Sequence, residues 1–409
     1  MAFALAGFIL AAAGDDWPQW RGPNRDGKAA GFKAPKTWPK ELSKKWKVTV
    51  GEGVSTPALV GDRLYIFFRA GANEVAQCID AETGKDLWTD RNEAPAIMGP
   101  ASGFQGPRSS PAVSDGKVLT LGAHGVLSCL DAATGKVLWR RNNLAGALPK
   151  FFTSCSPIVV DGMCIVQVGG EGGGAILACD LATGADKWRW DGDGSAYASP
   201  VLQVLDGAKT IVAETAGNIV GVGAADGKLL WKIPFAAQQR SYNAATPIID
   251  GSTVIFSGGN RGTKAVKIEK QGDAYAAKES WSNADKSVQF NTPVLKDGLL
   301  YGVTQANEFF CLNAKDGKTA WGAPAPAAGG GGGRMRGGGY ASIVDAGPVL
   351  FGLTPGSQLV VFEPSDKEFK QIASYKIADA PTHAHPVVSG NRIFIKDKDS
   401  IALWVVDQD

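Results

Sequence analysis

The nine residues DAATGKVLW, at Asp131–Trp139, carry the pattern that decides the fold. Closely similar stretches end at Trp88 and Trp188, and a tryptophan or its tyrosine equivalent returns eight times at nearly the same spacing. The eight aromatic residues are Trp46, Trp88, Trp139, Trp188, Trp231, Trp281, Trp321 and Tyr375. Self-similarity at this long a period indicates a repeat architecture, in which each unit contributes its own part of the core.

Each repeat opens with a small polar residue followed by proline. The openings are Thr56-Pro57, Ser110-Pro111, Ser156-Pro157, Ser199-Pro200, Thr246-Pro247, Thr292-Pro293, a degenerate Ser342-Ile343, and His385-Pro386. Seven steps separate Pro57 from Pro386, which gives a mean repeat of 47 residues. Each opening leads into a short β-rich segment and then a turn, most often Asp-Gly, and such pairs between apolar runs signal hairpins because the favoured turns need positive φ.

Two further segments complete each repeat. The third ends at the Asp-x-x-Thr-Gly turn, and the fourth carries the tryptophan. Four antiparallel strands repeated eight times predict an all-β chain folded as an eight-bladed β-propeller. The tryptophan ring is expected to fill the gap between neighbouring blades while its N–H reaches a backbone carbonyl. The Thr-Gly pair supplies a hydroxyl for local backbone bonding and a residue free to take positive φ.

The predicted organisation has three parts. Residues 15–43 form a leader that contains the sequence DWPQWRGPNRDG, and residues 44–407 form the propeller, with a flexible Gly-rich loop at 322–339. The last repeat has room for only three strands, so Lys44–Val50 is predicted to be the fourth strand of the final blade. That arrangement closes the ring without an open edge. Trp17 and Trp20 are expected to pin the leader against the propeller surface.

Composition and charge restrict the partners. The net charge of +2 is too close to neutral to indicate binding to nucleic acid or to a membrane surface. Residues 1–14, MAFALAGFILAAAG, form an apolar run that ends in small residues, as in a secretory signal cleaved near residue 14. The run is too short to span a bilayer. From this signal we expect a periplasmic or extracellular protein, and we expect it to be a monomer. The alternative for residues 1–14 is a buried N-terminal element of the fold.

The six cysteines do not form a metal or haem pattern. Cys78, Cys129 and Cys311 occupy the same position of the repeat, two residues before the Asp or Asn of the turn. Equivalent positions lie in different blades, so a small apolar core position explains them better than disulfide pairing does. No pair shows C-x-x-C spacing, and no metal site is predicted.

The phrase Asp-x-x-Thr-Gly-x-x-x-Trp at eightfold periodicity resembles the pyrroloquinoline-quinone repeat family. The leader Asp16–Gly27 resembles that of exported propeller proteins of planctomycete-type bacteria, which are often labelled as similar to BamB, an outer-membrane assembly factor. The resemblance covers nearly the whole chain after the apolar run. It implies the propeller fold but not one activity, because the family contains both quinone-dependent dehydrogenases and propellers without a cofactor.

The dehydrogenases of this family place the quinone between a tryptophan and two adjacent, disulfide-linked cysteines. They also use a calcium ion with carboxylate and amide ligands, and an Asp base. No two cysteines are adjacent here, and no counterpart of the calcium cluster is evident. The expected function is therefore a non-catalytic binding or assembly scaffold at the cell envelope without a cofactor, whose partner is an envelope protein, a peptide or a polar small molecule. A pyrroloquinoline-quinone- and calcium-dependent oxidoreductase is one alternative, and a sugar- or peptide-binding propeller is another.

The candidate ligand-binding residues precede the first strands of the repeats, which converge on one mouth of a propeller's channel. They are Arg108, Tyr197, Tyr242, Asn243, Gln289, Asn291, Tyr340, His383 and His385. Such aromatic, amide and basic groups can bind a polar small molecule, a sugar or an extended peptide. The alternative is that they satisfy loop backbone groups around a solvent-filled funnel. His383 and His385 lack a visible third ligand for a metal, and Asp191–Gly194 is expected to be a plain turn.

Overall fold

The computed structural model describes residues 15–144, 146–170, 172–238, 241–272, 274–325 and 340–408. The apolar run 1–14 lies outside the described residues, as do residues 326–339 of the Gly-rich loop. The signal peptide and the flexibility of residues 326–339 therefore stay predictions. The predicted loop of 322–339 begins too early, because residues 322–324 end the strand Thr319–Pro324 and pair with residues 308–310.

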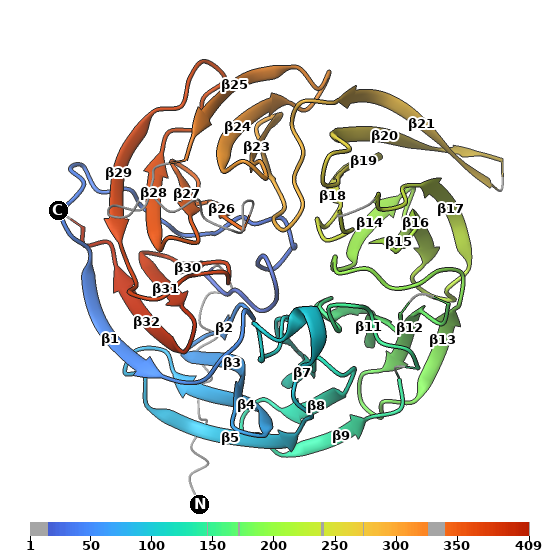
Figure 1. Ribbon diagram of the computed structural model, residues 1–409, viewed down its shortest axis with the longest axis horizontal. Coiled ribbons are helices and arrows are strands. Elements are labelled where there is room, and N and C mark those ends of the chain that lie inside the picture. The colour runs from blue at the N-terminus through green and yellow to red at the C-terminus, as the bar shows by residue number, and fades with distance from the viewer. Residues whose placement is uncertain are drawn as a thin grey trace, which may run out of the picture.

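The described residues form eight antiparallel sheets of four strands, arranged side by side around one axis (Figure 1). Blades one to four contain β2 (Ala58–Val60), β3 (Arg63–Ala70), β4 (Asn73–Asp80) and β5 (Asp86–Glu93); β6 (Ala112–Ser114), β7 (Lys117–Leu121), β8 (Leu127–Asp131) and β9 (Val137–Arg141); β10 (Ile158–Val160), β11 (Met163–Val168), β12 (Ala175–Asp180) and β13 (Asp186–Trp190); and β14 (Val201–Leu205), β15 (Ala208–Glu214), β16 (Asn218–Gly223) and β17 (Leu229–Pro234).

Blades five to eight contain β18 (Ile248–Asp250), β19 (Thr253–Ser257), β20 (Thr263–Gln271) and β21 (Ala274–Asn283); β22 (Val294–Lys296), β23 (Leu299–Val303), β24 (Glu308–Asn313) and β25 (Thr319–Pro324); β26 (Ser342–Asp345), β27 (Leu350–Leu353), β28 (Gln358–Phe362) and β29 (Gln371–Lys376); and β30 (Val387–Ser389), β31 (Arg392–Lys396), β32 (Ser400–Val405) and β1 (Ser43–Thr49). The short 3-10 helix η1 (Gly99–Ala101) lies between β5 and β6. None of the helical segments in the described ranges is long and apolar enough to cross a membrane. The predicted eight-bladed propeller is confirmed.

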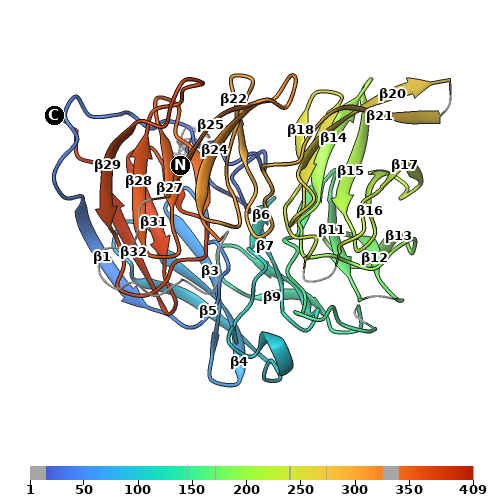
Figure 2. The same cartoon turned by 45° about the horizontal axis from the view of Figure 1, so that its top comes forward.

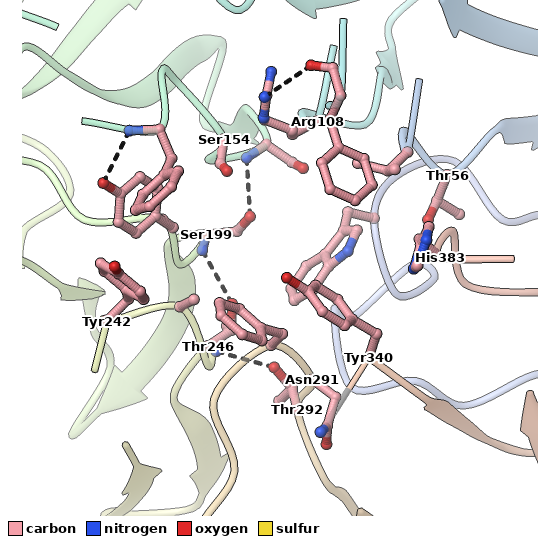
Figure 3. A pocket seen from close by; sticks show the side chains of 18 of the residues that line it. Thr56, Arg108, Ser154, Ser199, Tyr242, Thr246, Asn291, Thr292, Tyr340 and His383 are labelled. Atoms are coloured by element: carbon pink, nitrogen blue, oxygen red, sulfur yellow. Dashed lines mark hydrogen bonds between the residues drawn. The ribbon is translucent and has the colours of Figure 1, made fainter. Parts of the chain in front are cut away.

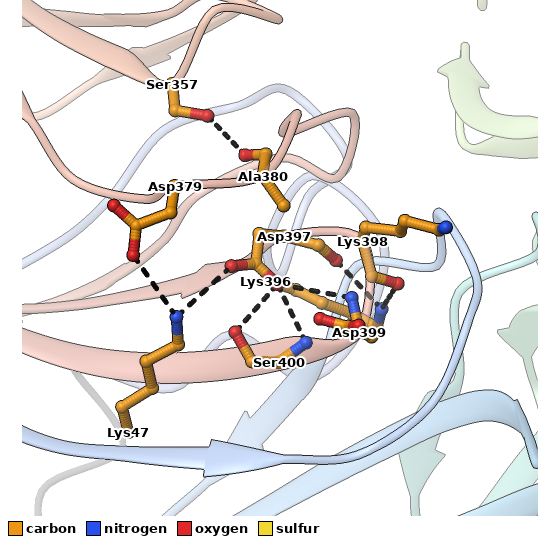
Figure 4. A network of polar contacts seen from close by, with 9 residues as sticks. All are labelled: Lys47, Ser357, Asp379, Ala380, Lys396, Asp397, Lys398, Asp399 and Ser400. Carbon is orange, nitrogen blue, oxygen red and sulfur yellow. Dashed lines mark hydrogen bonds and ion pairs between the residues drawn. The ribbon is translucent and has the colours of Figure 1, made fainter.

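The ring closes as the sequence predicts. Strand β1 pairs with β32 in an antiparallel register that runs from Ser43 opposite Val405 to Thr49 opposite Ser400. Figure 1 shows β1, in blue, beside the red strands at the C-terminal end of the chain. A buried lysine next to this seam, Lys396, donates its ammonium hydrogens to the carbonyls of Gly51 and Gly53, at 3.2 and 2.8 Å. It also donates to the carbonyls of Asp397 and Lys398, at 3.1 and 3.4 Å (Figure 4). Both ends of the chain are thus bonded into one blade.

The repeated tryptophan joins each blade to the next. Trp139 Nε1 donates to the carbonyl oxygen of Leu181 at 3.0 Å, in the Asp-x-x-Thr-Gly turn of the following blade. Gly184 of that turn lies against the same ring, so a Cβ there would come within 2.7 Å of it. The glycine is therefore needed for two reasons, its positive φ of 73° and the close approach of the indole. Equivalent N–H bonds are made by Trp46, Trp88, Trp188, Trp281 and Trp321.

A β-bulge directly before the tryptophan sets the direction of its side chain. In blade two, Trp139 is opposite Cys129 and Val137 is opposite Leu130, so Leu138 is the extra residue of the bulge and is left exposed. The same register shift precedes the tryptophan in blades one to six. In blade seven the shift precedes Ala373, so the prediction that Tyr375 takes the place of the tryptophan is wrong; Tyr375 lies opposite Leu359, and its hydroxyl donates to the carbonyl of Pro39 in the leader. The cysteines of the repeated position lie opposite the tryptophans and are buried and free. The prediction that they fill small apolar core positions is confirmed.

The leader does not lie on the outside of the propeller; it passes through the middle of the ring, where Figure 1 shows the first part of the chain as a blue coil. Trp17 is fully buried and exchanges two 2.8 Å backbone hydrogen bonds with Leu59 on the inner strand of blade one. Further on, Ala29 N–H donates to the carbonyl of Asp345 in blade seven. The prediction that the leader is pinned against the propeller surface is wrong in place, because its contacts are with the inner edges of the blades.

Two arginines hold the leader in the channel. Arg21 donates to the carbonyls of Thr292 and Pro293, at 2.5 and 2.8 Å, and Arg25 donates to the carbonyl of Pro200 at 2.6 Å. Arg25 also donates to the carbonyls of Ser156 and Pro157. Burial lowers the pKa of Arg21 to about 10 and that of Arg25 to about 9, so both remain charged at neutral pH. The hub of the ring is therefore filled by protein, and the channel is blocked below its mouth.

Candidate functional site

The small polar residues before proline form a hydrogen-bonded belt around the axis. In each link, the backbone N–H of one blade donates to the side-chain hydroxyl of the next, at 2.9–3.0 Å. The belt runs from His385 through Thr56, Ser110, Ser156, Ser199 and Thr246 to Thr292. A hydroxyl at this position can accept the neighbour's N–H and still donate its own hydrogen, which explains why serine and threonine recur there.

A pocket of about 400 Å³ opens above the belt, at the end of the ring where the inner strands begin (Figure 3). Trp20 of the leader lines it and makes an edge contact with the ring of His385, at 5.7 Å between ring centroids. Because the leader blocks the channel, the pocket is a cup and not a passage through the molecule. Figure 2 shows how the blades stand around this axis.

The lining follows a simple rule along the chain. In each blade, the residue two positions before the belt residue, or before Ser342 in blade seven, also lines the pocket, since alternate residues of an extended segment point to the same side. These residues are Val54, Arg108, Ser154, Tyr197, Ala244, Phe290, Tyr340 and His383. Tyr242, two positions further back, continues the same row in blade five.

Aromatic rings form a nearly continuous wall. Phe290 and Tyr340 stack in parallel, 4.5 Å between centroids and 4° apart in plane, and Tyr242 stacks on Phe290 at 6.3 Å. Edge contacts extend the wall through Phe151 to Tyr197 on one side and from Tyr340 to His383 on the other. Phe104, from the loop after η1, packs against His383 and is 43% exposed at the rim. These ring contacts join the walls of the pocket to one another.

The charges of the pocket have one sign. Arg108 is the only residue with a permanent charge among the described residues that line the pocket, and no aspartate or glutamate is among them. Burial lowers the pKa of His383, and it lowers that of His385 to about 3, so both imidazoles are neutral at pH 7. The pocket therefore favours neutral or anionic ligands over cations.

Seven of the nine predicted site residues line this pocket: Arg108, Tyr197, Tyr242, Asn291, Tyr340, His383 and His385. Asn243 does not; its amide donates to the carbonyls of Thr215 and Phe235 at 2.8 and 2.9 Å and accepts from Arg261, which holds loops of blades four and five together. Gln289 is also buried and accepts from Gln305. Both residues stand out of phase with the alternating row, but Asn291 is out of phase as well and lines the pocket, so phase alone does not decide which residues reach it.

The nine predicted site residues leave out Phe290, which belongs to the alternating row, and three aromatic residues outside that row, Trp20, Phe104 and Phe151. None of these three belongs to the repeat, and two come from connections between blades, so no periodic signal marks them. Sequence reasoning also missed that the serine and threonine hydroxyls before proline accept hydrogen bonds from the neighbouring blade. The Asp191–Gly194 segment is a turn as expected, and Asp193 accepts from the Thr215 hydroxyl at 2.6 Å and from Asn218 at 2.6 Å.

The lining does not fit a calcium-bound quinone. The described residues that form it include no carboxylate to bind calcium or to act as a base, and no cysteine. Among the described residues there is no group of three or more His, Cys, Asp or Glu side chains placed to hold a metal ion. His383 and His385 both line the pocket but gain no third ligand of these kinds.

The fold and the repeat define the class as a pyrroloquinoline-quinone-like repeat propeller. The family model of the outer membrane protein assembly factor BamB matches residues 71–323, more than half of the chain, so the chain belongs to that family.

The relatives of this chain include both BamB proteins and dehydrogenases. BamB of Yersinia pestis is 25% identical over 297 residues, which cover 68% of this chain and 70% of that protein. The quinohemoprotein alcohol dehydrogenase of Comamonas testosteroni is 33% identical over 143 residues, which cover 33% of this chain and only 19% of the dehydrogenase. The 1-butanol dehydrogenase of Thauera butanivorans is likewise matched over 27% of its length. The chain thus spans a fifth to about a quarter of these two dehydrogenases.

Solved structures confirm the fold. The structure of the Comamonas testosteroni dehydrogenase superposes with a TM-score of 0.69 at 16% identity and covers 97% of this chain and 81% of its own. BamB from Moraxella catarrhalis superposes with a TM-score of 0.64 at 12% identity and covers 89% of this chain and 99% of its own. At these identities the likeness concerns the fold alone.

Proposed function

We propose that this protein is an exported, non-catalytic β-propeller that acts as a binding and assembly scaffold at the cell envelope, with the aromatic pocket as its recognition site. The observation that carries the proposal is the composition of the pocket, whose described lining residues provide aromatic walls and hydrogen-bond donors and include no carboxylate and no cysteine. Such a lining suits recognition, because it offers surface and polar anchors without an acid–base pair. Family membership with an assembly factor supports the same role.

We also propose that the protein works without a quinone, as a monomer of the periplasm or cell exterior. The dehydrogenase alternative requires calcium ligands that the lining does not supply. Purified protein mixed with pyrroloquinoline quinone and calcium chloride is expected to show no quinone absorbance after desalting and no dye reduction with alcohols or sugars. Saturable quinone binding with turnover would replace the scaffold role by an oxidoreductase.

A photo-crosslinking amino acid at Phe104 tests the recognition role, because this residue is exposed at the rim of the pocket. The matched control is the same label at Val204, another exposed apolar residue, at 54% exposure, on β14 and outside the pocket. In intact envelopes of the source cell, a specific adduct is expected at position 104 and absent at 204. Identical patterns from both positions would contradict recognition at the mouth.

A sugar-binding role is the second candidate function, and the aromatic walls together with the belt hydroxyls favour it. It is compatible with a scaffold, since an envelope carries saccharides as well as proteins.

A further inference from the structure

The floor of the pocket is rich in hydrogen-bond donors. Five belt hydroxyls line it, and each already accepts one backbone N–H: Thr56, Ser156, Ser199, Thr246 and Thr292. With that lone pair used, the hydrogen of each hydroxyl remains to be donated, and it has no acceptor among the described residues. A floor of this kind suits a ligand whose oxygens accept hydrogen bonds.

Arg108 adds a positioned positive charge. Its guanidinium donates to the carbonyls of Gly106 and Phe104, at 3.1 and 2.9 Å, which fixes it at the wall of the pocket. A guanidinium has five N–H donors in a fork geometry, so further N–H groups remain for a ligand. The buried carboxyl of Glu74 interacts with this charge from outside the lining, and burial raises the pKa of that carboxyl. Among the described residues that line the pocket there is no carboxylate, so on the pocket side Arg108 can pair with an anion that enters from solvent.

The walls favour a ring with C–H faces. The wall from Tyr197 through Tyr242 and Phe290 to Tyr340 presents rings that carry polar hydroxyls on three of its four members. Aromatic side chains with one polar end bind groups that are apolar on a face and hydroxylated at the edge. The cavity of about 400 Å³ lies in the range of roughly 300–1,000 Å³ that is typical of small-molecule sites.

Building on the proposed function, we infer that the pocket binds an acidic saccharide, with one or two sugar rings against the aromatic wall and an oxyanion held by Arg108 and the belt hydroxyls. The shared chemistry is an oxyanion on a sugar ring, supplied by a carboxylate in a uronic acid or by a sulfate ester. A neutral sugar would leave the arginine without its partner, and a cationic sugar would be repelled by it.

Isothermal titration calorimetry of the full chain tests this inference with three trisaccharides: trigalacturonate, a sulfated galactotriose and unsubstituted galactotriose. At least one acidic trisaccharide is expected to bind at least tenfold more tightly than the neutral one. Which of the two binds identifies the oxyanion. Arg108→Gln is expected to reduce that preference at least tenfold, while Tyr340→Ala is expected to weaken all binding by about tenfold, since it removes the stacking surface.

The matched control is Arg69→Gln. Arg69 also donates to two backbone carbonyls, those of Pro95 and Ala94, but it does not line the pocket. It is expected to bind like the wild type, and melting curves confirm that each variant is folded. Equal affinity for neutral and acidic trisaccharides, or no binding of an acidic one by folded protein at millimolar concentration, would overturn the inference. Quinone binding in a parallel titration would overturn it as well. An envelope adduct at Phe104 that forms without saccharide binding would leave the scaffold role standing.

Discussion

At the scale of the residue, the most unusual side chain is Glu214, at the end of β15. It is fully buried, and neither carboxylate oxygen has a partner among the described residues. Burial raises the pKa of Glu214 well above its ordinary value, against a smaller opposing effect of Arg261. The carboxyl group is therefore protonated in the folded protein at pH values where the unfolded chain would release the proton.

This leads to a pH-dependent prediction. The unfolded state loses its proton near pH 4.3, whereas the folded state keeps it to higher pH, so Glu214 reduces stability progressively as pH rises through that window. Glu214→Gln, which imitates the protonated acid, is expected to raise the Tm by about 2 °C or more at pH 8 and to leave it unchanged at pH 4. Thermal melts at both pH values measure this. Glu82→Gln, at an exposed turn, is the control, and an equal gain for it would contradict the prediction.

A second prediction at this scale concerns the blade-joining tryptophans. Trp231 is buried like the others, but its N–H has no acceptor among the described residues. Blade five lacks the Asp-x-x-Thr-Gly turn that would supply one, because β20 continues to Gln271. Trp188, by contrast, donates to the carbonyl of Ala224 at 2.9 Å.

Replacing each by phenylalanine separates the hydrogen bond from the packing. Trp188→Phe is expected to cost about 1 kcal/mol more in unfolding free energy than Trp231→Phe, the net worth of one buried hydrogen bond. Urea denaturation of the two variants gives the difference. If the two losses are the same, the indole hydrogen bonds do not contribute to joining the blades.

At the scale of the element, β1 is the strand on which closure depends. Its partner β32 would otherwise be an open edge, and edge strands expose unpaired backbone groups. Replacing Ser43–Thr49 by a Gly/Ser linker of the same length is expected to lower the Tm by more than 10 °C. Thermal melts and light scattering would report both the loss of stability and the exposed edge.

The structure also offers a rescue for this variant. Because Ser43 lies opposite Val405, a short turn after Asp407 can lead directly into an appended copy of the β1 sequence. The appended strand is expected to restore most of the lost stability. A linker variant as stable as the parent chain, or an appended strand without effect, would contradict the role of β1.

Strands such as β1 can be predicted from the sequence, because the repeat determines both the spacing of the strands and which of their residues face the neighbouring blade. The Asp-Gly turns, the tryptophan strands and the shortage of one strand in the last repeat predict the blades and their closure. The same alternation explains site residues such as Tyr197 and His383. It does not separate Asn291, which lines the pocket, from Asn243 and Gln289, which do not, since all three are out of phase with the row. Residues outside the repeat, such as Phe104 in the connection between β5 and β6, could not be predicted because no periodic pattern in the sequence marks them as pocket residues.

At the scale of the whole molecule, the leader in the hub could not be predicted. Its arginines bind backbone carbonyls of blades three, four and six, and every chain has carbonyls, so no complementary residue marks the site. Trp20 of the leader lines the pocket above the blocked channel, and no repeat marks it either. Long-range contacts of this kind appear only in the folded structure.

A prediction at this scale tests the leader as a part of the core. Arg25→Met is expected to lower the unfolding free energy by about 3 kcal/mol or more, because three buried carbonyls lose their donor. Arg91→Met, at an exposed position of β5, is the control and is expected to change it by less than about 0.5 kcal/mol. Denaturant titrations measure both. A mild loss for Arg25→Met would mean that the leader is dispensable to the ring.

The position of the leader has a consequence for the order in which the protein forms. As the chain is synthesised, Arg21 emerges early, yet its acceptors Thr292 and Pro293 follow 271 and 272 residues later. These bonds can therefore form only after five blades have been synthesised, the bond of Ala29 to Asp345 needs the first strand of blade seven, and the pairing of β1 with β32 needs the last blade. Contacts between such distant residues slow folding. The leader is thus among the last segments to reach its final position. Until then it has to remain unaggregated beside blades that are only partly folded.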